Sequence, residues 1–167
     1  PVAIDVAGFE ALGRAFDLAR ERGILLYDIM TERHEVTTIL QKTLSAIAPV
    51  FGELRRGSVE DPAIIKESVH HYSKQVSGAA IKRPAWFFDT AQQGEGLVDI
   101  TTHLVDLVQW ECFPGQTLDW RADIRVAGAR RWPTAITPAQ FAQVTQLAAW
   151  PDFLRKDAQA DGNLHVY

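Results

Sequence analysis

The sequence predicts an α+β fold of two α/β layers, in which helices pack on one face of an open sheet that is mostly antiparallel or mixed. Three observations predict this class. Apolar residues recur at helical spacing in several segments. Residues 118–126 alternate strictly between apolar and charged side chains, which is typical of a strand with one solvated face. Residues 24–30 form a short, mostly apolar run of strand length.

The composition limits the classes of protein to consider. The chain has 167 residues, 47% of them hydrophobic and 23% charged, which suffices for one full-sized domain. We expect no membrane partner, because no apolar run is long enough for a transmembrane helix. The formal net charge is −4 and the basic residues are scattered, which argues against nucleic-acid binding. We expect a cytoplasmic protein, although a chain that begins with Pro1 rather than Met reveals little about targeting signals.

The first third of the chain predicts a helix, a strand and a second helix. Asp5 can cap the first helix and Gly23 can end it. The apolar run 24–30 follows as a buried strand, which makes the opening an α/β unit. Thr31 can cap the second helix, whose apolar residues repeat with helical period until Pro49 stops it.

Arg33 lies in the first turn of this second predicted helix. A positive charge is unfavourable there because it opposes the helix dipole. Arg33 is therefore a candidate to bind an anionic or hydroxylated ligand, and the alternative is an ordinary solvated side chain.

The middle of the chain predicts two strand pieces, residues 51–54 and 69–76, separated by a turn-rich segment. His70 and His71 are adjacent in the second piece, and a strand directs neighbouring side chains to opposite faces. The two histidines therefore cannot jointly hold one ion, and we expect no metal site. The lone thiol of Cys112 is expected to act as a small buried hydrophobe.

An aromatic stretch over residues 82–89 leads into a polar loop. Trp86 is a candidate stacking platform for a sugar. Clustered aromatic residues more commonly belong to a core, and we expect a core position for at least two of Trp86, Phe87 and Phe88. Asp89 and Gln93 stand in the loop beside glycines, where they can form the rim of a pocket.

Residues 94–110 are the most informative stretch of the sequence. A glycine-bounded start turns into a helix that is apolar around most of its circumference. The remaining stripe carries Asp99, His103, Asp106 and Trp110, spaced four, three and four residues apart. A helix this apolar should be buried. Its polar stripe therefore either lines a cleft or belongs to a core in which His103 merely hydrogen-bonds a neighbour.

The last third predicts three further elements. Residues 118–126 form the clearest strand of the sequence. Thr137, Pro138 and Gln140 provide a cap, a proline at the first helical position and a capping-box partner for a helix that ends before Pro151. Residues 164–167 begin a strand.

Residues 94–106, Gly-Glu-Gly-Leu-Val-Asp-Ile-Thr-Thr-His-Leu-Val-Asp, resemble a motif of the glucose-fructose oxidoreductase and inositol dehydrogenase (Gfo/Idh/MocA) family, above all of its members with an oxidoreductase C-terminal domain. The resemblance implies an oxidoreductase that uses NAD or NADP on a hydroxyl of a sugar or polyol. Asp99 and His103 would be catalytic, with His103 taking or relaying the hydroxyl proton. Thr102 belongs to the same motif and joins Arg33, Trp86, Asp89 and Gln93 as substrate-binding candidates.

The resemblance also implies a domain organisation. Residues 1–30 would be the last α/β unit of a Rossmann domain, and residues 31–167 would form the substrate-binding α/β domain, cut short at its C-terminus. The lysine of the family's Glu-Lys-Pro motif would immediately precede Pro1, and the nucleotide-binding half that holds most of the cofactor would be absent. This chain alone is then expected to be inactive.

Two other functions stay open. The same fold can serve as a catalytically silent carbohydrate-binding or oligomerisation domain, and in this family the sheet often builds a homo-oligomer. Asp99, His103 and Asp106 could instead form a metal or hydrolase site, although a third firm ligand is hard to place.

Overall fold

The computed structural model describes residues 3–28, 30–69 and 71–167. Pro1, Val2, Ile29 and His70 lie outside the described residues, and so does the prediction that His70 and His71 point to opposite faces of a strand. The chain divides into two compact units. The first unit comprises Pro1–Leu26, Val69–Ile100 and Arg131–Tyr167, and the second comprises Tyr27–Ser68 and Thr101–Arg130. The division at residue 30 stays a prediction.

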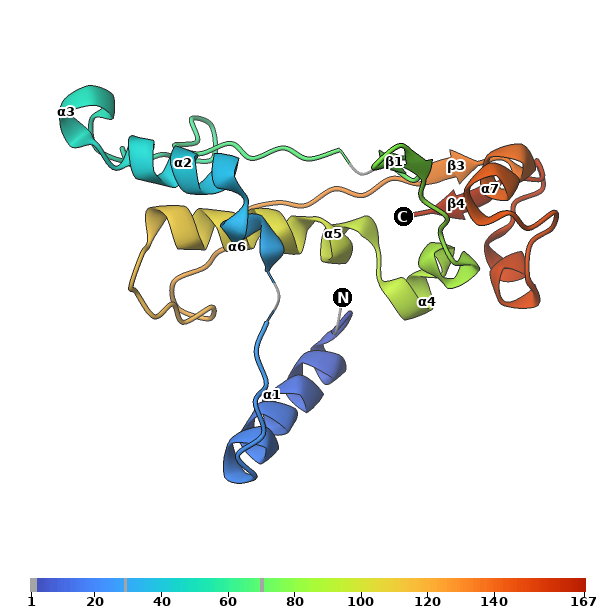
Figure 1. Cartoon of the computed structure of the whole chain (residues 1–167), viewed down its shortest axis with the longest axis horizontal. Coiled ribbons are helices and arrows are strands. Elements are labelled where there is room, and N and C mark those ends of the chain that lie inside the picture. The colour runs from blue at the N-terminus through green and yellow to red at the C-terminus, as the bar shows by residue number, and fades with distance from the viewer. Residues whose placement is uncertain (1–2, 29, 70) are drawn as a thin grey trace. The chain divides into compact units, whose positions relative to one another are not determined.

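The predicted α+β class is confirmed, because helices are accompanied by small antiparallel sheets (Figure 1). The first unit contains α1 (Val6–Glu21), β1 (Gln75–Val76), β2 (Ala79–Ala80), η2 (Ala85–Phe88), α4 (Thr90–Gln93), α5 (Gly96–Asp99), β3 (Thr134–Ile136), α7 (Pro138–Thr145), η3 (Asp152–Asp157) and β4 (Leu164–Val166). The second unit contains η1 (Thr31–His34), α2 (Val36–Ser45), α3 (Ala48–Phe51) and α6 (Thr101–Cys112). Among the described residues, no helix is both long and apolar enough to cross a membrane.

Local capping signals in the sequence fix two helices of the first unit. The Asp5 side chain accepts a hydrogen bond from the Gly8 amide at 2.7 Å and caps α1, as predicted. Thr137 and Gln140 form the complete capping box of α7. Both sets of contacts join residues three apart, so they form without help from distant parts of the chain.

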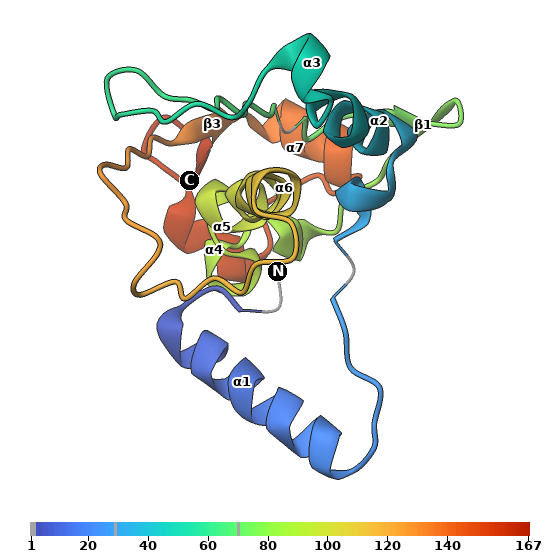
Figure 2. The ribbon, with the colours of Figure 1, turned by 90° about the vertical axis from the view of Figure 1, so that its left-hand side faces the viewer.

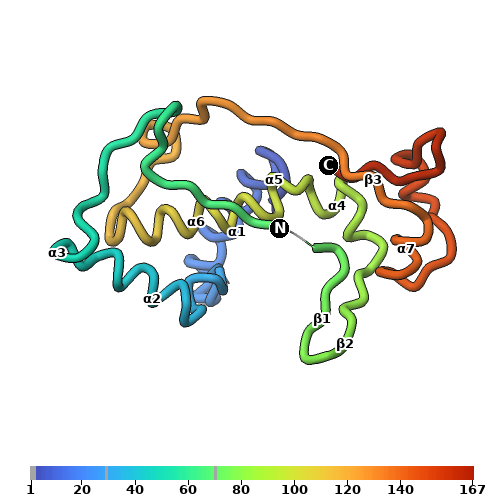
Figure 3. Tube along the Cα trace, turned by 90° about the horizontal axis from the view of Figure 1, so that it is seen from above, coloured from blue at the N-terminus to red at the C-terminus, as the bar shows by residue number. Residues whose placement is uncertain are grey.

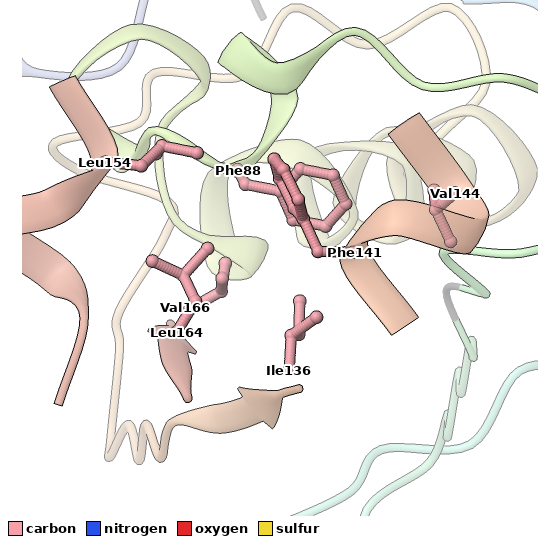
Figure 4. Close-up of a cluster of buried hydrophobic side chains, with 7 residues drawn as sticks. All are labelled: Phe88, Ile136, Phe141, Val144, Leu154, Leu164 and Val166. Atoms are coloured by element: carbon pink, nitrogen blue, oxygen red, sulfur yellow. The ribbon is translucent and has the colours of Figure 1, made fainter. Parts of the chain in front are cut away.

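The core of the first unit lies between the β3–β4 sheet, α7, η2 and η3 (Figure 4). β3 pairs with β4 so that Ile136 faces Leu164 across the sheet. The rings of Phe88 and Phe141 lie 5.4 Å apart, and Leu154 is completely buried. Half-buried Tyr72 and Phe87 pack against this cluster. Phe87 and Phe88, two of the three aromatic residues over 86–88, therefore belong to the core.

In the second unit, η1 and α2 both contact α6. α6 and α2 lie side by side in Figures 2 and 3. The ammonium group of Lys42 on α2 lies 3.7 Å from the centre of the Trp110 ring on α6, which is a cation–π contact. The helix predicted from Thr31 onward is interrupted, because Glu35 is extended and splits it into η1 and α2. The predicted Thr31 cap is therefore wrong, since the helix proper begins at Val36.

Four strand predictions need correction. The described residues of 24–30 form no strand, residues 52–54 form none, and Phe51 ends α3. Only Gln75–Val76 of the piece 69–76 pairs, in the short β1–β2 hairpin seen in Figure 3. Residues 118–126 form no strand either: the Asp123 carboxylate accepts from the Asp119 amide at 2.8 Å and closes a turn. An alternating pattern makes a strand only where another strand supplies hydrogen bonds.

Candidate functional site

The predicted site residues are shared between the two units. Trp86, Asp89, Gln93 and Asp99 lie in the first unit, whereas Arg33, Thr102 and His103 lie in the second. The predicted single helix over residues 94–110 is two helices, since α5 ends at Asp99 and α6 begins at Thr101.

In the second unit, His103 of α6 faces Glu32 of η1. Its Nδ1 atom lies 2.8 Å from Oε2 of Glu32. These two atoms are buried, and among the described residues neither makes a hydrogen bond, although they lie within hydrogen-bond distance of each other. About a third of each side chain is nevertheless exposed, 35% for His103 and 34% for Glu32. Part of the imidazole ring can therefore be reached from solvent.

The neighbouring pair joins Arg33 of η1 to Asp106 of α6. The guanidinium binds the carboxylate with two hydrogen bonds, one of them from Nε to Oδ2 at 2.7 Å. The hydrogen bond to Asp106 is the main cause that raises the pKa of Arg33 above its ordinary value, outweighing the opposing effect of burial. Arg33 was predicted to bind substrate, and here its guanidinium is engaged by the protein itself.

The far end of α6 carries a further ion pair and borders a cavity. Lys66 donates to both carboxylate oxygens of Glu111 at 2.8 Å, and both side chains are largely buried. Burial, then the charge of Glu111, raises the pKa of the Cys112 thiol, against a smaller opposing effect of Lys66. This thiol is therefore a poor nucleophile. The cavity has a volume of about 760 Å³ and a mainly apolar wall that includes Leu104, Val108, Phe113 and Ile124.

In the first unit, Asp99 is held beside Gln93 and near Tyr72. The Gln93 amide donates to the Asp99 carboxylate at 2.9 Å, which brings two predicted site residues together. Burial raises the pKa of Tyr72, and the negative charge of Asp99 adds to the shift. Asp99 thus ends α5 in a polar group with Gln93.

The glycine turn before α5 has a structural reason. Gly94 has φ +82° and ψ 172°, a conformation nearly restricted to glycine. A Cβ atom there would also approach Ile4 to 3.0 Å. The Gly96 amide already donates to the carbonyl of Tyr167 at 2.9 Å. The Gly96 amide is therefore occupied within the protein and is not free to bind a phosphate.

Asp89 is buried, with only 4% of its surface exposed, and caps α4. Its carboxylate accepts from the Ala91 amide at 3.1 Å and from Gln92 at 2.8 Å. Burial opposes ionisation of Asp89. These hydrogen bonds and Lys156 outweigh that effect and hold the pKa of Asp89 below its ordinary value.

The remaining predicted ligand contacts are on the surface. Trp86 is 47% exposed, while its neighbour Phe88 is buried. Thr102 is exposed on α6. Among residues 3–28, 30–69 and 71–167, no three metal-ligating side chains cluster around a common point.

The sequence interpretation missed Glu32. Asp106 was recognised on the predicted stripe, but the partners of His103 and Asp106 come from η1, 73 residues away in the case of Arg33 and Asp106. No periodicity connects two segments so far apart, so only the folded chain reveals the pairing.

Comparison with known proteins places the chain in a family. The family described as "Putative oxidoreductase C terminal domain" matches residues 40–167. The crystal structure of a putative oxidoreductase from Parabacteroides merdae ATCC 43184 is 54% identical in sequence, with a TM-score of 0.91. The match covers 100% of this chain and 38% of that one, so this chain spans well under half the length of that protein. A search of curated proteins finds no match. The chain therefore belongs to the family of putative oxidoreductase C-terminal domains.

Proposed function

We propose that this chain is the substrate-side part of an NAD- or NADP-dependent oxidoreductase of the Gfo/Idh/MocA type that acts on a hydroxyl of a sugar or polyol. The observation that carries the proposal is His103. The chain belongs to a family of oxidoreductase C-terminal domains. Within it, His103 exposes part of its imidazole to solvent, and the Glu32 carboxylate lies against its Nδ1 atom.

The proposed chemistry of His103 is proton transfer. A carbinol carbon gives up hydride readily only as the hydroxyl proton is removed, which needs a base within hydrogen-bond reach. Histidine is the side chain best suited to exchange a proton near neutral pH. The role that the resemblance implies for Asp99, orienting a substrate hydroxyl, stays a prediction; its carboxylate is held by Gln93 at the end of α5. Substrate contacts from Thr102, Trp86 and Asp89 stay predictions, as does the one from Arg33.

The hydride acceptor is proposed to be a nicotinamide cofactor held by another part of the polypeptide, as the family resemblance implies. The relative's length supports such a part, since this chain corresponds to 38% of it. Cytoplasmic location and a homo-oligomer built through the sheet stay predictions.

The proposal is tested in the whole polypeptide that carries this chain, assayed with polyols and sugars for formation of reduced nicotinamide. His103→Asn should lower kcat/KM by roughly two to four orders of magnitude, because proton transfer by a side chain contributes about that much. His71→Asn is the matched control, since His71 is an exposed histidine of the other unit, and it should retain activity.

Two outcomes would contradict the proposal. Wild-type kcat/KM in His103→Asn would remove His103 from the reaction. Failure of the whole polypeptide to bind either dinucleotide in a titration would favour the alternative, a catalytically silent carbohydrate-binding or oligomerisation domain.

A further inference from the structure

We propose that Glu32 is a positioning residue for His103: its carboxylate holds the proton on Nδ1, so that Nε2 is the nitrogen that exchanges a proton with substrate. The inference rests on the proposed role of His103. It adds a residue outside the Asp99–His103 motif and assigns the working atom of the ring.

The first argument is the separation of the two atoms. Nδ1 of His103 and Oε2 of Glu32 are 2.8 Å apart and both are buried. A carboxylate oxygen is an acceptor only, and a neutral imidazole has one donor nitrogen and one acceptor nitrogen. Two lone pairs at this distance would repel each other, so the contact favours the ring form with its proton on Nδ1.

The second argument is that the pair lacks competing partners. Among the described residues, neither Nδ1 of His103 nor Oε2 of Glu32 makes a hydrogen bond, to the other or to a third group. A buried carboxylate oxygen without a hydrogen bond is costly, and the cost falls when a proton is directed at it. The ring nitrogen, 2.8 Å away, is the group placed to direct a proton at this oxygen.

The third argument is that the adjacent ion pair keeps Glu32 in place. Arg33, the next residue of η1, binds Asp106 through two hydrogen bonds, and Asp106 follows His103 by three residues on the same side of α6. The Arg33–Asp106 pair therefore fixes η1 along α6 at the level where Glu32 reaches the imidazole. Two contacts between the same two elements define both position and rotation, which a single contact does not.

The expected benefit is the one that a carboxylate gives to a catalytic histidine in other enzymes. It selects the ring form with a free acceptor nitrogen and stabilises the imidazolium that forms when the proton is taken up. The pair is only about two-thirds buried, so substrate can approach the exposed side of the ring.

The direct test is the protonation form of the His103 ring, read from the nitrogen chemical shifts of isotope-labelled histidine in the whole polypeptide. The His103→Asn variant assigns the signal. Wild type should show the proton on Nδ1, and Glu32→Ala should show a mixture of ring forms. Glu32→Gln should restore the Nδ1 form, because its amide oxygen is also an acceptor toward which the Nδ1 proton can point. Glu35→Ala, an exposed carboxylate three residues away, is the control and should match wild type.

Kinetics give the second measurement. Glu32→Ala should lower kcat by roughly tenfold to a hundredfold with little change in KM, because substrate binding does not use this carboxylate. Glu32→Gln should regain part of the loss, since it restores the ring form without the charge.

A wild-type ring with its proton on Nε2 would overturn the inference without any variant. So would an Nδ1 form that persists in Glu32→Ala. If the ring forms behave as expected but His103→Asn retains full activity, the positioning contact stands and the proposed function fails. If His103→Asn is inactive and Glu32→Ala is unchanged in ring form and kcat, only this inference fails.

Discussion

Single residues carry more than one possible role until their contacts are known. The Asp89 position beside glycines suggested the rim of a pocket, yet its carboxylate caps α4 and bonds Gln92. Glu32 offered no signal at all, because its partner His103 lies in another segment and its neighbours are also charged. Residue type and spacing made Asp99 and His103 candidates, whereas the carboxylate beside the histidine could be found only in the folded chain.

Asp89→Asn tests the structural role of that carboxylate through pH. The folded-state pKa of Asp89 is held below its ordinary value, so the ionised group stabilises the fold above the unfolded-state pKa, near 3.9. That contribution is lost as the pH falls through the folded-state pKa. Wild type should therefore be more stable than Asp89→Asn at neutral pH, and the difference should shrink below about pH 4 in urea denaturation.

Asp152→Asn is the control for Asp89, since the Asp152 side chain is 90% exposed and its ion pair lies on the surface. It should show no such pH-dependent difference. Equal behaviour of the two variants would mean that the Asp89 contacts do not form in solution.

At the scale of elements, local signals predicted well and long-range pairing did not. The caps of α1 and α7 could be predicted because Asp5 and Thr137 bond residues three positions away. The alternating run 118–126 carries an equally clear pattern, but the Asp119–Asp123 turn takes its place. A strand needs an edge with which to pair, and a sequence pattern does not supply that edge.

Thr137→Ala tests the capping box of α7. The change removes the side-chain acceptor of the Gln140 amide, and loss of such a cap costs about 1 kcal/mol. The midpoint of thermal unfolding should fall by several degrees, while Thr38→Ala, within α2, should change it less. An unaltered midpoint in Thr137→Ala would show that the box does not support the helix.

The docking of η1 on α6 is tested by a double-mutant cycle on Arg33 and Asp106. Groups in direct contact couple by about 0.5 to 3 kcal/mol, and a two-point contact between charges should lie within that range. Arg33→Ala, Asp106→Ala and the double variant are compared by denaturant unfolding. Additive effects would contradict the pairing.

At the scale of the whole molecule, the fold class followed from helical spacing and the presence of strand patterns, while the extent of the sheets did not. The only core cluster among the described residues belongs to the first unit and is built by Phe88, Phe141 and Leu154 with the β3–β4 strands (Figure 4). The second unit is instead held by charged contacts along α6. Apolar residues of its α2 and α3, such as Leu40 and Phe51, stay more than half exposed.

Leu154→Ala tests this distribution of stability. Leu154 is fully buried, and truncating a buried leucine costs about 2 to 5 kcal/mol. Leu25→Ala is the matched control, because Leu25 is 83% exposed and its truncation should change the unfolding free energy by less than about 0.5 kcal/mol. Similar losses in both variants would contradict the described core.

The central claim is that His103 exchanges the substrate proton in an oxidoreductase. The most direct measurement is kcat/KM of the whole polypeptide for its best polyol or sugar substrate, compared between wild type and His103→Asn at neutral pH. The account predicts a loss of roughly two to four orders of magnitude, with dinucleotide binding unchanged. A His103→Asn variant with wild-type kcat/KM would contradict it.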